Sequence, residues 1–135
     1  KFDEYFKFAF VRHPLDWQVS LYEYIKNTPH KDQNLVQKIT FKEFALREIK
    51  NNSPRQIDFL TEKKNFIIDN IYNFENIDRE IEELFKTLNI TIKKNKIKHL
   101  NKSPRIKNFY EYYDNELEKA VRDYYSEDFK LLGYD

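Results

Sequence analysis

The chain has 135 residues, enough for one domain that buries roughly two thirds of the surface its unfolded chain exposes. Its 12 Phe and 10 Tyr supply a core and so exclude disorder, although 35% of the residues are charged. A formal net charge of +1 excludes a general attraction to nucleic acid or acidic membranes, and the absence of cysteine excludes disulfides, a thiol nucleophile and thiolate metal ligands.

The first predicted element is a short strand near the start of the chain. Phenylalanines alternate with smaller or charged residues over residues 6–11, which is the period-two pattern of a strand. Pro14 then suits the first position of a helix, because its φ is already helical and that position needs no N–H donor. The segment predicts a strand followed directly by a helix.

Arg12 and Ser20 are the candidate anion-binding residues of this junction. Arg12 is expected where the strand ends, and Ser20 about two turns into the helix on the side of Asp16. A phosphate at the junction could accept a bidentate guanidinium contact and a hydrogen bond from the hydroxyl. The alternative is an ordinary turn in which the arginine pairs with a neighbouring carboxylate and the serine faces a helix.

Three further helices and one further strand follow. Thr40 opens a helix through a capping box with Glu43, residues 66–68 fit a short strand, and Asn76 and Asp114 each cap a helix. The aromatic residues of segment 109–113 are expected in the core rather than on a nucleotide or sugar. The core-facing residues predicted for the three helices are Phe41, Phe44, Ala45 and Ile49, then Ile77, Ile81, Leu84, Phe85 and Leu88, and last Leu117, Val121, Tyr124 and Tyr125.

Segment 93–107 is the one concentrated basic stretch, with seven lysines and arginines and no acid. It predicts either a solvated loop balanced by the acids of segment 111–128 or part of an anion site. No recognition motif accompanies the charges, so nucleic acid is not an expected partner. The three histidines match no metal-binding spacing, so no metal site and no catalytic base are assigned. No apolar run reaches the roughly 18 residues of a membrane span.

Residues 12–22, RHPLDWQVSLY, resemble the 3′-phosphate-binding segment of sulfotransferases that use 3′-phosphoadenosine 5′-phosphosulfate (PAPS). The pattern of those enzymes is R-x-P-x-x-R-x-x-S-x-Y. The resemblance assigns Arg12 and Ser20 to the 3′-phosphate of the donor and Tyr22 to packing behind them. Trp17 stands where carbohydrate sulfotransferases usually carry a second arginine, so that second cation is missing here.

The resemblance continues along the chain. Segments 53–60, 66–77, 99–105 and 112–134 occur in the order seen in carbohydrate sulfotransferases of the heparan and chondroitin type and their bacterial relatives. It implies a single domain over residues 1–135 with a helix-rich α/β fold, a partial P-loop-like sulfotransferase fold with a few short parallel strands. It adds three residues of a later loop to the cofactor-binding pocket, namely Lys102, Ser103 and Arg105.

The implied function is transfer of a sulfuryl group from PAPS to a hydroxyl, with a carbohydrate as the expected acceptor. The single glycine, Gly133, excludes a Walker-type phosphate loop. In the family, the loop that holds the 5′-phosphosulfate precedes the arginine and serine segment, whereas seven residues precede Phe8 here. The chain is therefore expected to be the C-terminal portion of a sulfotransferase-like domain and to be inactive alone. The alternative is a non-catalytic anion-binding or protein-interaction domain that retains the scaffold.

Overall fold

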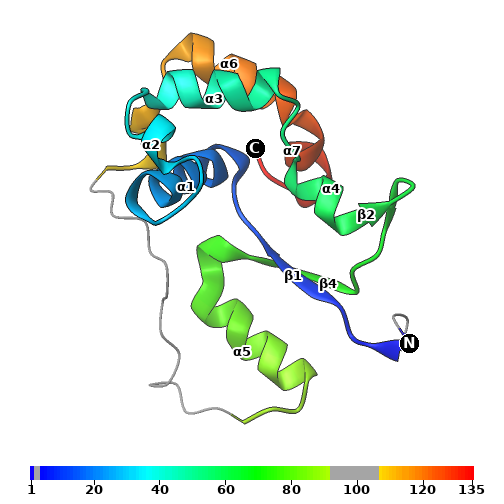
Figure 1. The fold of residues 1–135 in the computed structure, drawn as a ribbon. Coiled ribbons are helices and arrows are strands. Elements are labelled where there is room, and N and C mark those ends of the chain that lie inside the picture. The colour runs from blue at the N-terminus through cyan, green and yellow to red at the C-terminus, as the bar shows by residue number, and fades with distance from the viewer. Residues whose placement is uncertain (2–3, 92–106) are drawn as a thin grey trace. The chain divides into compact units, whose positions relative to one another are not determined.

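The structure is a computed structural model that describes Lys1, residues 4–91 and residues 107–135. The described residues form two compact units, each built from two separated stretches of chain (Figure 1). The first unit takes the described residues up to Arg12 and those from Leu60 to 91, and the second takes residues 13–59 and 107–135. The boundary between Arg12 and His13 therefore falls inside the segment that the sequence singled out.

The first unit contains a parallel strand pair formed by β1 (Phe8–Val11) and β4 (Asn70–Asn73). Phe8 is opposite Asn70 and Val11 is opposite Asn73. The 3₁₀-helix η2 (Phe74–Asn76) follows β4 and leads into α5 (Ile77–Thr87), which packs against β4. Leu84 is the buried residue of α5. The two carboxyl ends of the parallel strands consequently lie at one edge of the pair.

A hairpin completes the first unit. Strands β2 (Thr61–Glu62) and β3 (Asn65–Phe66) pair antiparallel. The two turn residues, Lys63 and Lys64, have φ values of 49° and 68°. Positive φ at both positions is the geometry of a type I′ turn, whose twist matches that of two antiparallel strands.

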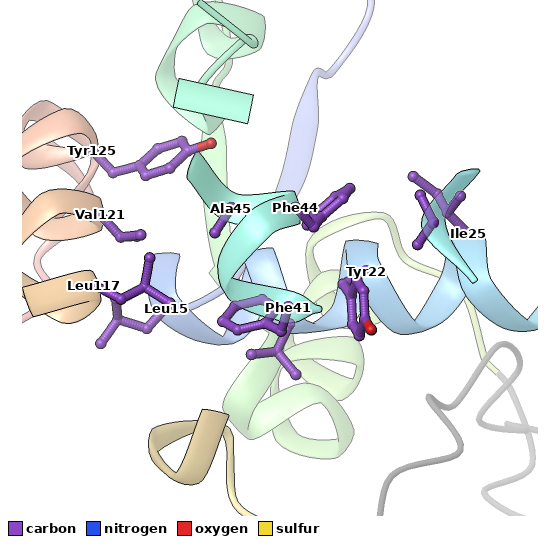
Figure 2. Packing of buried hydrophobic residues seen from close by; sticks show 11 residues of the cluster. Leu15, Tyr22, Ile25, Phe41, Phe44, Ala45, Leu117, Val121 and Tyr125 are labelled. Atoms are coloured by element: carbon purple, nitrogen blue, oxygen red, sulfur yellow. The ribbon is translucent and has the colours of Figure 1, made fainter. Parts of the chain in front are cut away.

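The second unit is helical in the part that the structure describes. Helix α1 (Pro14–Asn27) packs against α2 (Gln33–Val36), α3 (Phe41–Lys50), α6 (Asn115–Tyr124) and the 3₁₀-helix η4 (Phe109–Tyr112). Two short helices, α4 (Gln56–Leu60) and α7 (Ser126–Leu132), complete the element order. The buried cluster comes mainly from α1, α3 and α6 (Figure 2) and consists of Leu15, Val19, Tyr22, Ile25, Val36, Phe41, Phe44, Ala45, Leu117, Val121 and Tyr125.

Polar side chains inside the second unit are hydrogen-bonded across long stretches of sequence. Gln18 Nε2 donates to the Tyr125 hydroxyl at 2.6 Å, and the Tyr113 hydroxyl donates to the Leu15 carbonyl at 2.8 Å. Burial raises the pKa of both tyrosines, so their hydroxyls stay protonated. Because a buried polar group without a partner is costly, these bonds fix which faces of α1 and α6 meet.

Asp128 is the most buried acid among the described residues, with 0% of its surface exposed. Its two carboxylate oxygens accept hydrogen bonds from the backbone N–H groups of Gln56 at 3.0 Å and Ile57 at 2.8 Å. Those amides open α4 and have no partner within that helix. A side chain of α7 therefore caps α4, and burial raises the pKa of the Asp128 carboxyl.

Most predicted elements are confirmed, and so is the helix-rich α/β class with short strands. Pro14 occupies the first position of α1, and Thr40 caps α3 by accepting from the Glu43 N–H at 3.2 Å. The residues predicted to face the core from α3 and α6 are buried or pack against the core cluster. Helices α2, α4 and α7 are shorter than eight residues and were not predicted.

Two local predictions were wrong. The predicted strand over 66–68 overlaps the observed strand β3 only at Phe66, where β3 ends, and the Ile67 N–H donates to the Leu60 carbonyl. Asn76 precedes α5, but its side chain makes no capping hydrogen bond. Its φ of −115° and ψ of 33° lie outside the extended region that a capping side chain needs, since the chain is already turning through η2.

Asp114 gives the first testable prediction. Its carboxylate caps α6 by accepting from the Leu117 N–H at 2.7 Å and also accepts from Lys42 Nζ of α3 at 2.9 Å. The hydrogen bond from Lys42 lowers the pKa of Asp114 below its usual range. Asn can cap equally well but has no charge, so Asp114→Asn isolates the ionic part.

A lowered carboxyl pKa in the folded state contributes stability above the unfolded pKa, about 3.9, and loses it as pH falls through the folded value. Wild type is therefore expected to exceed Asp114→Asn in unfolding free energy at pH 7, with the difference shrinking below about pH 4 and in 1 M salt. Urea unfolding at several pH values measures this. A difference that stays constant down to pH 2 would contradict the role of the Lys42 pair.

Candidate functional site

Arg12 lies directly after β1, as the sequence predicted, and belongs to the first unit. Its guanidinium carbon is 3.7 Å from the centroid of the Phe74 ring. Phe74 begins η2, which follows β4, so the parallel pairing of the two strands brings arginine and aromatic ring together. The guanidinium therefore lies close to the face of an aromatic ring, which attracts a cation. The contact restricts the arginine beside the end of β1, and a guanidinium is the group that can bind a bidentate acceptor.

Ser20 lies in α1 in the second unit, half-buried and one turn after Asp16 on the same side of the helix. Arg12 and Ser20 thus fall in different units, each described by itself, and eight positions of sequence separate them. The assignment of both to one phosphate remains a prediction.

The neighbours of Ser20 in α1 have packing roles. Tyr22 is buried, its hydroxyl donates to the Ile39 carbonyl at 3.1 Å, and its ring contacts Phe41 and Phe44 of α3. Trp17, which replaces the second arginine of the pattern, lies with its ring 5.9 Å from that of Tyr125, edge to face. The side chain at position 17 therefore belongs to the core of the second unit.

The structure gives His13 a specific role. It is the N-cap of α1, with Nδ1 accepting a hydrogen bond from the Leu15 N–H at 3.3 Å. Its position immediately before Pro14, the first helical residue, was the available sequence signal. Four aromatic rings lie within 6.0 Å of the imidazole, ring centre to ring centre, and they belong to Phe109, Tyr110, Phe129 and Tyr134.

Lys102, Ser103 and Arg105, the other predicted cofactor-binding residues, lie outside the described residues, as does most of the basic stretch. Lys107 is described, and its ammonium nitrogen lies 4.2 Å from the centroid of the Tyr112 ring. The sequence predicted that the aromatic residues of segment 109–113 lie in the core. This is confirmed for Phe109, Tyr112 and Tyr113, which pack against the core, whereas Tyr110 is 47% exposed.

A cleft in the second unit was not predicted, because its walls come from α1, α3, η4 and the residues beside them. The ammonium groups of Lys26 and Lys107 lie over the rings of Tyr22 and Tyr112. Buried Glu23 accepts a hydrogen bond from the Tyr112 hydroxyl at 2.9 Å. The residues that line this cleft are Tyr22, Glu23, Lys26, Thr40, Phe41, Lys42, Lys107 and Tyr112. It offers ammonium, carboxylate and hydroxyl groups on one concave surface.

Both histidines among the described residues accept a hydrogen bond through Nδ1. His13 is occupied as a cap, and His30 Nδ1 accepts from the Asp32 N–H at 3.0 Å in the loop after α1. Arg55 is held by Asp58, with contacts of 3.1 and 3.2 Å from its guanidinium, which lower the pKa of Asp58.

Among residues 1, 4–91 and 107–135, no group of three His, Asp or Glu could hold a metal ion. Within the same ranges no helix combines the length and apolarity needed to cross a bilayer.

Comparison with known proteins gives one positive finding. The family model described as the sulfotransferase family matches residues 1–135. No curated protein and no solved structure matches the chain.

Proposed function

Since the chain belongs to the sulfotransferase family, we propose that it serves the transfer of a sulfuryl group from PAPS to a hydroxyl on a carbohydrate. Residues 1–135 form the C-terminal portion of that domain and supply the 3′-phosphate half of the donor site. Arg12 and Ser20 bind the 3′-phosphate, and Lys102, Ser103 and Arg105 complete the pocket. These 135 residues alone do not transfer the group, because their candidate ligands address only that end of the donor.

The position of Arg12 is the observation that supports this proposal most. A guanidinium that follows a strand and stacks on Phe74 is held in place before any ligand arrives, so little side-chain entropy is lost on binding. Its planar fork matches two oxygens of a phosphate. A donor that carries a 3′-phosphate offers such a group far from the reacting sulfur.

Binding at the 3′ end contributes to the reaction by positioning. The acceptor oxygen forms a bond to sulfur as the bond from sulfur to the 5′-phosphate oxygen breaks, and the acceptor hydroxyl loses its proton to a base. The bisphosphate 3′-phosphoadenosine 5′-phosphate leaves. Arg12 and Ser20 hold the nucleotide so that the sulfur faces the acceptor in line, using binding energy remote from the bond that changes.

The cleft of the second unit supports a carbohydrate acceptor. Sugars present many hydroxyl groups, which both donate and accept hydrogen bonds. The cleft provides acceptors in the Glu23 carboxylate and donors in the ammonium groups of Lys26 and Lys107. The Tyr112 hydroxyl donates to Glu23 and can still accept, and the Thr40 hydroxyl accepts from the Glu43 N–H and can still donate.

Titration calorimetry with two nucleotides tests the donor assignment. The chain is expected to bind 3′-phosphoadenosine 5′-phosphate at least about tenfold more tightly than AMP, because only the former has the phosphate that Arg12 and Ser20 bind. Ser20→Ala is expected to reduce this preference severalfold, through loss of one hydrogen bond to a charged group. Equal affinities for the two nucleotides would contradict the proposal, and tight ATP binding would indicate an unrelated nucleotide site.

A further inference from the structure

The N-cap of α1 depends on the protonation state of its side chain. Ser, Thr, Asp and Asn are the usual capping residues. Of these, Ser, Thr and Asn accept hydrogen bonds at every ordinary pH. At this helix the acceptor is Nδ1 of His13, which can accept from the Leu15 N–H only while it has no proton. The cap therefore requires the neutral imidazole, with its single proton on Nε2.

Protonation would remove the cap and add a repulsion. The imidazolium is a donor at both nitrogens, so Nδ1 would face the Leu15 N–H with a proton of its own. A positive charge at a helix N-terminus also opposes the helix dipole. Both effects disfavour the first turn of α1.

The surroundings of His13 define what else could titrate with it. The rings packed against it from η4 and α7 and from the C-terminal residues include two phenols, those of Tyr110 and Tyr134. Phenols remain neutral until about pH 10. In the sequence two charged residues stand within three positions of it, Asp16 in the first turn of α1 and Arg12, the preceding residue. Histidine is the side chain whose ordinary pKa lies between pH 5 and 8.

We propose that His13 is a positioning residue for donor binding, whose neutral imidazole keeps the first turn of α1 formed and whose protonation weakens binding of the nucleotide. This rests on the proposed function, because the first turn of α1 separates Arg12 from Ser20 in the chain. Both can act on one phosphate only while that turn is ordered. When it frays, the apparent affinity falls by the fraction of molecules that remain competent.

His13→Asn provides the matched comparison, since Asn is a good cap that does not titrate. Affinities for 3′-phosphoadenosine 5′-phosphate are measured for both proteins from pH 7.5 to 5.5. The quantity compared is the dissociation constant of wild type divided by that of His13→Asn. Protonation of the ligand affects both proteins equally and cancels in this ratio. That ratio is expected to lie near one at pH 7.5 and to rise to about five at pH 5.5. His13→Ala, which has no cap, is expected to bind about fivefold more weakly than wild type at pH 7.5.

Three results would overturn the inference. A ratio that is constant with pH would show that the titration of His13 does not affect binding, although the proposed function would stand. A ratio that falls with acidification would mean that the imidazolium attracts the phosphate directly. If no variant binds the bisphosphate, the proposed function fails. Urea unfolding without ligand then tests whether neutral His13 caps α1. In that case an unfolding free-energy difference between wild type and His13→Asn that is independent of pH would refute the capping role.

Discussion

Replacing Arg12 by alanine is expected to weaken binding of 3′-phosphoadenosine 5′-phosphate by about ten- to a hundredfold while affinity for AMP changes little. A hydrogen bond to a charged partner contributes roughly 1.5 to 3 kcal/mol, so the loss of even one of the two contacts of a bidentate guanidinium gives a change of this size. Because the proposal assigns Arg12 to the 3′-phosphate and to no other part of the nucleotide, the preference for the bisphosphate should shrink by the same factor. Titration calorimetry with both nucleotides measures the change.

Two further variants make this result specific. Arg79→Ala removes an arginine of the same unit from the exposed surface of α5 and is expected to leave both affinities unchanged apart from a small, salt-dependent effect. Arg12→Lys keeps the charge but not the fork, so its affinity should lie between those of wild type and Arg12→Ala. If Arg79→Ala weakens binding as much as Arg12→Ala does, diffuse positive charge rather than the strand end binds the phosphate.

Replacing Asp128 by alanine is expected to lower the unfolding free energy by about 2–4 kcal/mol. The substitution leaves the N–H groups of Gln56 and Ile57 without their acceptor in a buried place, and each such loss costs about 1–3 kcal/mol. Relief from burying a charge offsets part of this. Glu127→Ala, at the neighbouring exposed position of α7, is the control and should change stability by less than about 0.5 kcal/mol. Urea unfolding of wild type, Asp128→Ala and Glu127→Ala measures these differences in unfolding free energy.

The raised pKa of Asp128 adds a dependence on pH. The folded chain binds this proton more tightly than the unfolded chain does, so the contribution of Asp128 to stability increases as pH falls from the folded pKa to the unfolded pKa near 3.9. Asp128→Asn does not titrate. The difference in unfolding free energy, wild type minus Asp128→Asn, is therefore expected to grow on acidification. A decrease would mean that the two amide hydrogen bonds outweigh the effect of burial.

Local patterns were sufficient to predict much of the fold. Thr40 and Glu43 stand three positions apart and signal a helix start on their own, and Pro14 after alternating phenylalanines signals both a strand end and a helix start. The position of Arg12 followed from the same local pattern. Each of these signals lies within a few residues of what it predicts.

Features that depend on distant residues were not predictable in this way. The Phe74 ring beneath Arg12 results from the pairing of β1 with β4, and the capping of α4 by Asp128 joins residues 72 positions apart. Neither pair shares a local signal, because topology decides which segments meet. The walls of the cleft that includes Glu23 and Lys107 are likewise assembled from separate segments.

The hydrogen bond between Gln18 and Tyr125 joins residues 107 positions apart, and this separation has a consequence for synthesis on the ribosome. Helix α1 is made before Leu117, Val121 and Tyr125, which pack with it in one buried cluster. At about 5–20 residues per second, the helix waits on the order of 5–20 s for these residues. During this interval the nascent chain exposes leucine, valine and tyrosine side chains, and it depends on chaperones or on rapid completion to avoid aggregation.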